Sequence, residues 1–134
     1  MLNPNHKRVL SETFREVEDE LRDLRRLLLR TEEERIFLHI VDDLTQEEKQ
    51  VFNVKIGQMM DLIIRLKSLF ELKPGQRVLR WIARATAVYL SVQLEQVMSD
   101  RLEGYGEVAP EDKETLDPKL NEMLSIFREV KSTV

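Results

Sequence analysis

The stretch "LSETFREVEDELRDLRRLLL", residues 10–29, predicts the fold class. Its apolar side chains recur at spacings of four, three, four, three and four, at Leu10, Phe14, Val17, Leu21, Leu24 and Leu28. This alternation places them along one side of an α-helix, as in helices that pack lengthwise at a shallow crossing angle. We therefore predict a helix over residues 11–30 whose apolar side lies against a neighbouring helix and whose charged side faces solvent.

A second stretch has the same spacing. Its apolar positions are Phe52, Ile56, Met59, Ile63, Leu66 and Phe70. The segment "TQEE", Thr45 to Glu48, has the form of a capping box, in which the two side chains satisfy free backbone N–H groups at a helix start. Pro74 and Gly75 disfavour continuation of the helix. We predict a helix over residues 46–72 that packs against the first one.

The segment between these two helices carries a similar start signal. "TEEE", Thr31 to Glu34, also has the form of a capping box. It predicts a short helix over residues 32–44. The apolar side of that helix consists of Ile36, Phe37, Ile40, Val41 and Leu44. One continuous helix from Ser11 to Leu44 is the alternative.

The helix expected over residues 76–103 is apolar around most of its circumference, because 14 of the 21 residues from Val78 to Met98 are apolar. This composition is typical of a central helix or of a helix in an oligomer interface. The polar residues fall within a stripe about 60° wide, calculated at 100° per residue. The stripe consists of Arg77, Arg80, Arg84, Ser91 and Glu95. We expect it to face solvent or a ligand.

The last predicted helix covers residues 117–131. Asp117 fits an N-cap and Pro118 the first helical position, and the apolar side consists of Leu120, Met123, Phe127 and Val130. The preceding residues 104–116 contain two glycines and one proline, which predicts a loop. A linker of this length allows the last helix to pack in its own chain or in a partner's.

Composition agrees with an all-α fold. The chain has 134 residues, only four Gly and four Pro, 42% hydrophobic and 34% charged residues. We predict one domain over residues 1–134, an antiparallel bundle of four to five helices with heptad-like, coiled-coil packing. Cysteine is absent, which excludes disulfides and thiolate chemistry and fits a reducing cytoplasm. We expect neither a signal peptide nor a membrane span.

The arginines of the polar stripe are the candidate binding site. Arg77, Arg80 and Arg84 lie in the first half of a predicted helix, where the helix dipole disfavours positive charge. Such a conflict is typical of an anion site or of compensation by neighbours. In an antiparallel hairpin, Glu71 would lie near Arg77 and Asp61 near Arg84, so structural pairing is the alternative interpretation.

Four acidic residues of the first helix have the spacing with which all-α nucleotide pyrophosphohydrolases hold Mg²⁺. They are Glu16, Asp19, Glu20 and Asp23. A metal site in a bundle needs ligands that project inward from several helices, whereas these acids flank or oppose the apolar side. His39, Asp42 and Asp43 lack the repeated Glu-x-x-His pattern of di-iron bundles. We therefore predict neither a metal nor another cofactor.

Three functional hypotheses follow. The net charge of −4 argues against a general nucleic-acid binder. The leading hypothesis is a non-catalytic protein–protein interaction module, such as an assembly subunit or regulator of a larger complex, which forms a homodimer or binds a helical protein. Its partner surface would comprise the helix over 76–103, the loop and the last helix. The alternatives are a Mg²⁺-dependent nucleotide pyrophosphohydrolase and an accessory factor of a nucleic-acid complex that uses the arginine stripe.

Overall fold

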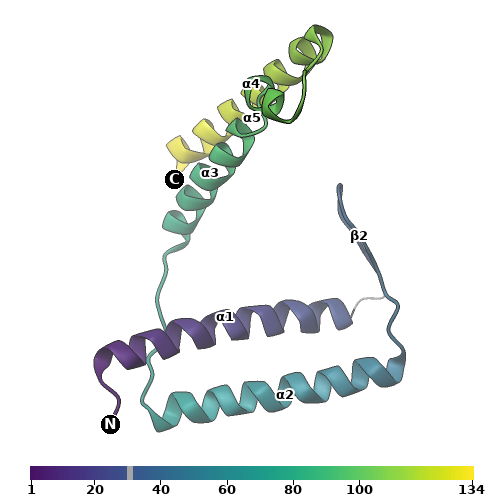
Figure 1. Ribbon diagram of the computed structural model, residues 1–134. Helices are drawn as coiled ribbons and strands as arrows, with labels where there is room; N and C mark the ends of the chain where they lie inside the picture. Colours follow the sequence, from purple (N-terminus) through teal and green to yellow (C-terminus); the bar gives the residue numbers. More distant parts are fainter. Residues whose placement is uncertain (30–31) are drawn as a thin grey trace. The chain divides into compact units, whose positions relative to one another are not determined.

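The computed structural model describes residues 1–29 and 32–134, and of residues 32–34 the backbone (Figure 1). The chain divides into two compact units, Met1–Gly75 and Gln76–Val134. The first contains α1 (Pro4–Leu28), β1 (Glu32–Glu34), β2 (His39–Val41) and α2 (Gln46–Leu69). The second contains α3 (Leu79–Glu95), α4 (Ser99–Leu102), the 3-10 turn η1 (Glu103–Tyr105) and α5 (Pro110–Thr133). The all-α class is confirmed apart from one small hairpin, while the single domain and the complete bundle stay predictions.

In the first unit, α1 and α2 lie side by side, joined through the hairpin (Figure 1). Their contact buries Leu28 of α1 and Ile56 of α2. The guanidinium of Arg25 lies beside Gly57, at ordinary van der Waals distance from where a Cβ would stand. Most of the predicted apolar side of α1, from Leu10 to Leu21, is half-buried. Two packed helices cover only a strip along each other's surface, so much of the apolar surface of α1 and α2 stays exposed to solvent.

The helix α1 begins earlier than its apolar pattern predicts. Pro4 occupies the first helical position, where its missing N–H costs nothing. The Asn3 side chain accepts a hydrogen bond from the His6 backbone N–H at 2.8 Å. The imidazole Nδ1 of His6 in turn accepts from the Asn3 N–H at 3.2 Å. His6 thus completes a capping box in place of the usual Glu or Gln.

The predicted helix over residues 32–44 is wrong, and so is the continuous helix from Ser11 to Leu44. The strands β1 and β2 pair antiparallel, with Glu32 opposite Val41, and the Arg35 N–H donates to the Leu38 carbonyl at 2.7 Å to close the turn. Four apolar residues of this segment, Ile36, Phe37, Ile40 and Val41, are β-branched or aromatic, which favours strands over a helix. Thr31, the proposed cap, lies outside the described residues.

The predicted start of α2 is confirmed. The Thr45 hydroxyl accepts from the Glu48 N–H at 3.1 Å, and the Glu48 carboxylate accepts from the Thr45 N–H at 3.0 Å. One turn later, Lys49 is only 8% exposed and forms an ion pair with Asp42, whose carboxylate also accepts from the Leu44 N–H. The hydrogen bond from Lys49 lowers the pKa of Asp42. This pair ties the segment after β2 to the first turn of α2.

The helix α2 ends before Pro74 and Gly75 are reached. Glu71 adopts a left-handed conformation with φ 53°. The Leu72 N–H donates to the Lys67 carbonyl at 2.8 Å, the Glu71 N–H donates to the Ser68 carbonyl at 3.3 Å, and Leu72 is buried. These bonds form a Schellman motif, in which glycine usually takes the left-handed position. Glutamate gives no sequence signal for such a stop.

The second unit consists of α3 and α5 side by side, with α4 and η1 in the connection between them (Figure 1). The predicted helix over 76–103 is divided, because α3 spans only Leu79–Glu95. The predicted loop over 104–116 is mostly helical, because α5 starts at Pro110. Glu111 and Asp112 in its first turn complement the helix dipole. Pro118, predicted as the first helical position, lies inside α5.

Asp117 caps a helix other than the one predicted. From within α5 its carboxylate accepts the Ser99 backbone N–H at 2.9 Å and the Ser99 hydroxyl at 2.5 Å. Ser99 is the buried first residue of α4. These hydrogen bonds lower the pKa of Asp117. An ion pair between Lys113 and Glu103 holds the same connection against α5.

We predict that Glu71→Gly stabilises the first unit by about 1 kcal/mol, since the left-handed conformation costs an L-residue about 1–2 kcal/mol and glycine almost nothing. The free energy of unfolding is measured by urea denaturation. Lys73→Gly, at an exposed position beyond the motif, serves as the control and gives no gain. An unchanged or lower stability of Glu71→Gly would contradict the Schellman stop.

We predict that Asp117→Ala lowers the melting temperature of the chain at pH 7, because the buried Ser99 groups lose their acceptor. The lowered pKa means that the folded carboxyl binds a proton less readily than the unfolded one. Its stabilisation is therefore complete above the ordinary carboxyl pKa and is lost as the pH falls through the lowered value.

Thermal unfolding followed by circular dichroism between pH 7 and about pH 2 checks this pH dependence. The difference between wild type and Asp117→Ala should shrink toward the acid end. Glu114→Ala, an exposed position of the same helix, is the control. A difference that stays constant with pH would show that the charge of Asp117 plays no part.

Candidate functional site

The side of α3 that faces α5 carries small residues over most of its length. Ala87 is the most buried at 2% exposed, Ala83 and Ser91 on the same side are half-buried, and the larger Leu94 follows them. The Ser91 hydroxyl donates to the Ala87 carbonyl at 2.7 Å, so this half-buried hydroxyl has a partner. On α5, which packs against α3, Leu120 and Leu124 are buried.

The polar stripe, expected to face solvent or a ligand, lies at the edge of this contact. Ser91 is half-buried, whereas Arg80, Arg84 and Glu95 of the stripe are exposed. Side-chain size determines which side of α3 lies against α5, because two helices approach closely where one of them carries small residues. The large apolar residues of α3 therefore cover the outer side.

That outer side, which we name the open α3 face, spans about 200° of the helix circumference. Its large apolar residues are all exposed: Val78, Leu79, Trp81, Ile82, Val88, Tyr89, Leu90, Val92 and Val97. Trp81 and Tyr89 are 58% and 62% exposed. No charged side chain lies within this arc, since Arg80, Arg84 and Glu95 all fall on the other side. Contiguous exposed apolar surface of this size is typical of a protein interface.

The three predicted binding arginines do not form one cluster on a helix. Arg77 precedes α3, whose N-cap is Val78. Arg80 donates from its Nη1 to the Val134 carbonyl at 3.0 Å, which places it at the C-terminal end of α5. The negative end of the α5 dipole thus compensates for a cation in the first turn of α3. Arg84 is exposed. The ion pairs expected from Arg77 to Glu71 and from Arg84 to Asp61 join residues of the two units and stay predictions.

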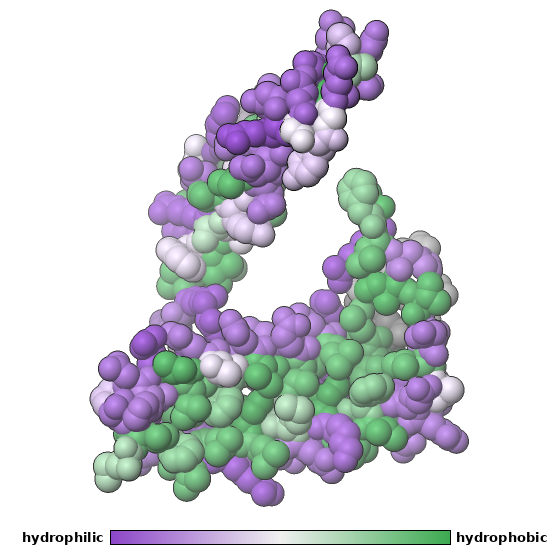
Figure 2. Space-filling model, in the orientation of Figure 1, coloured by the Kyte–Doolittle hydropathy of each residue, from purple (hydrophilic) through white to green (hydrophobic). Residues whose placement is uncertain are grey.

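The first unit has an apolar surface of its own. Figure 2 shows hydrophobic side chains gathered along the face where α1 and α2 lie side by side. Phe52 and Met59, predicted to face α1, are among the exposed residues of α2. At the turn of the hairpin, Ile36 is 92% and Phe37 98% exposed. Sequence reasoning missed this turn, because it placed both residues on the buried side of a helix.

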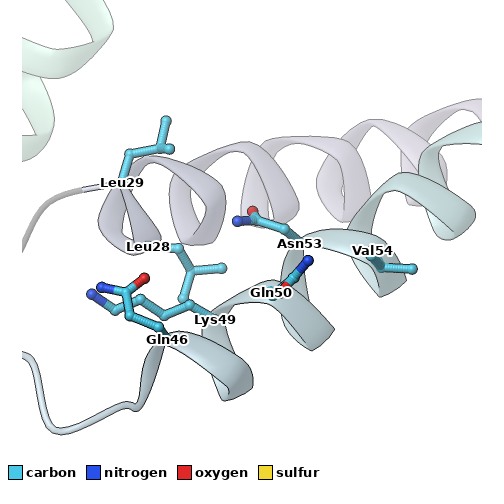
Figure 3. Close-up of a pocket in the computed structure, with 7 residues that line it drawn as sticks. All are labelled: Leu28, Leu29, Gln46, Lys49, Gln50, Asn53 and Val54. Atoms are coloured by element: carbon cyan, nitrogen blue, oxygen red, sulfur yellow. The ribbon is translucent and has the colours of Figure 1, made fainter.

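A shallow pocket of about 640 Å³ lies between the end of α1 and the start of α2 (Figure 3). Three amide side chains line it, from Gln46, Gln50 and Asn53, together with apolar groups. Among the described lining residues, the ionisable one is Lys49, which is already paired with Asp42. The described lining can donate and accept hydrogen bonds, and it contains no Ser, His, Asp or Glu that could act as nucleophile or general base.

The acidic residues considered as Mg²⁺ ligands are spread along solvent-exposed sides of α1. Glu16, Asp19, Glu20 and Asp23 are all exposed. His39 lies on β2, so it no longer shares a helical turn with Asp42 and Asp43. Within the described residues, no group of three His, Asp or Glu side chains could hold a metal ion.

A helix that crosses a lipid bilayer needs about 20 consecutive, predominantly apolar residues. None of the helices over residues 1–29 and 32–134 combines that length with that apolarity.

We predict that Ala87→Leu destabilises the second unit by about 1–3 kcal/mol, because the larger side chain overpacks the α3–α5 contact. Ala85→Leu, the same change on the exposed side of α3, should alter the free energy of unfolding by less than about 0.5 kcal/mol. Urea denaturation of both variants at one chain concentration checks this difference. Equal effects of the two substitutions would contradict the observed orientation of α3.

Comparisons with known proteins add no family to this picture. No family model, no curated protein and no solved structure matches the chain. The functional argument therefore depends on the residues and surfaces described above.

Proposed function

We propose that the chain is a non-catalytic protein–protein interaction module, an assembly subunit or regulator that acts within a larger complex. The observation that carries this proposal is the open α3 face. It combines two aromatic side chains with seven aliphatic ones and no charge. Buried aromatic residues are the usual anchors of tight protein interfaces.

The total accessible surface supports this proposal. The chain exposes 11213 Å². Two separate compact units of these lengths expose about 8900 Å² together, which is less than this total. Both units have large hydrophobic residues among their exposed side chains, and exposure of apolar surface to water costs about 25 cal/mol per Å². A partner that covers this surface would remove that cost.

The chemistry of the surface favours a helical partner. The pairs α1–α2 and α3–α5 each present the apolar side of two neighbouring helices. Two further helices laid along such a pair give a four-helix bundle with heptad-like packing, the most common way to bury apolar helix surfaces lengthwise. The antiparallel bundle predicted from the sequence is thus proposed for the complex. Because the chain has no cysteine, a reducing compartment such as the cytoplasm is compatible with it.

The ionisable groups with shifted pKa values support a structural role over a catalytic one. Each has its pKa shifted by a bond that holds two segments together: Asp42 by Lys49, Asp117 by Ser99, and Lys113 by Glu103. These bonds join neighbouring segments of one unit, and none of the groups lies in the amide-lined part of the pocket.

We predict that Trp81→Glu disrupts partner binding, because a charge in the centre of an apolar interface must be desolvated without a counter-ion. The tagged chain is isolated from its native lysate, and bound proteins, including untagged copies of the chain, are quantified by mass spectrometry. We expect the amount of partner protein recovered with Trp81→Glu to be about tenfold lower than with the wild-type chain.

Tyr105→Glu provides the matched control. Tyr105 is an aromatic residue of the same unit, 92% exposed in η1 and away from α3. This variant should retain the partner at the wild-type level. A monomeric wild type without any stoichiometric partner, or equal recovery with both variants, would contradict the proposed function.

A further inference from the structure

The charges beside the open α3 face have an ordered distribution. Arg84 lies toward the start of α3 and Glu95 is its last residue, and both lie beside the same edge of the face. In the described part of the chain, neither Arg84 nor Glu95 forms an ion pair. Tyr89 lies at the middle of the open α3 face, on the opposite side of the helix from the small residues that contact α5.

We propose that the open α3 face is occupied by α3 of a second copy of this chain, in an antiparallel arrangement with the two-fold axis beside Tyr89. This inference rests on the proposed function, because it names the partner of the same surface. An interface between identical surfaces around a two-fold axis is the most common way in which soluble proteins form homo-oligomers.

Charge complementarity argues for the antiparallel direction. Rotation about an axis beside Tyr89 brings the start of one α3 alongside the end of the other. Arg84 then lies next to Glu95 of the second copy, and the same contact occurs twice. In a parallel pair, Arg84 would lie level with Arg84 of the second copy, and the helix dipoles would be aligned unfavourably.

The available area is sufficient for a dimer. With about 150–250 Å² for a fully exposed aromatic side chain, the apolar residues of the open α3 face expose on the order of 900 Å² together. One partner of a standard stable interface contributes about 800 Å². The face therefore offers about the area that one partner of a stable dimer contributes, and the second α3 covers a strip of it.

The side chains also suit a symmetric contact. Tyr89 lies beside Tyr89 of the second copy at the axis, where aromatic pairs stabilise an interface through offset or edge-to-face contacts. Trp81 and Val88 lie on the same edge of the face as Arg84 and Glu95, so the two-fold axis brings these aromatic and aliphatic side chains of both copies to the same edge. Because the face carries no charge, an identical face covers it without burying an unpaired ion.

Disulfide cross-linking tests the arrangement directly, because the chain contains no cysteine of its own. Tyr89→Cys, beside the axis, should form a covalent dimer under mild oxidation. Leu79→Cys lies about 15 Å along the helix from the axis, which separates the two copies of this residue by about 30 Å in the antiparallel arrangement. It should stay monomeric on a denaturing gel.

Charge reversal tests the same register without removing apolar contacts. Sedimentation equilibrium of the full chain should give the mass of a dimer. Arg84→Glu and Glu95→Arg should each raise the dimer dissociation constant by about tenfold, because each creates two like-charge contacts. The double variant Arg84→Glu with Glu95→Arg should return to within about threefold of wild type.

Several results would overturn the inference. A wild-type chain that sediments as a monomer at micromolar concentration excludes the second copy as the occupant. Efficient cross-linking of Leu79→Cys, or a double charge reversal as weak as the single ones, excludes the antiparallel register. If the wild-type chain is a monomer but binds a different helical protein, and Trp81→Glu abolishes that binding, the proposed function stands and only the homodimer is excluded. The failure of the homodimer is therefore distinguishable from the failure of the proposed function.

Discussion

The close contact between α3 and α5 is the constraint on which the second unit and its surface depend. Ala87 and Ser91 allow α5 to approach, and α5 buries Leu120 and Leu124. A helix has only one side to offer at such a contact, and α3 offers its small side. Its large apolar side chains must then lie outward. The proposed interaction surface is a direct consequence of this choice of contact.

In each unit a polar contact holds a connecting segment in place. Lys49 and Asp42 join the end of the hairpin to α2, and Asp117 satisfies the first N–H of α4 from the middle of α5. A buried ion pair contributes less to stability than its Coulomb energy suggests, because both charges lose water. Such pairs define which segments lie together. The large apolar side chains beside them stay exposed.

Local sequence signals predicted the structure well where one pattern is compatible with only one structure. The capping box of Thr45 and Glu48 starts α2 as expected, and the apolar spacing identified α1. The signals failed where two outcomes shared a pattern. Ile36 and Phe37 fit both a short helix and a hairpin, and Asp117 before Pro118 fits a helix start as well as an interior position. The left-handed Glu71 had no signal, because its conformation is imposed by the buried Leu72 and the backbone bonds of the stop.

The amino-acid sequence by itself determined that the chain is helical and that α3 carries more apolar surface than an ordinary solvent-facing helix, because periodicity and composition are local properties. Only the tertiary structure decided which side of α3 is covered. The size of the side chains at a helix contact, together with hydrogen bonds between distant residues such as Arg80 and Val134, determines that orientation. Neither can be read from the hydrophobic pattern of one helix, since both depend on the element that packs against it.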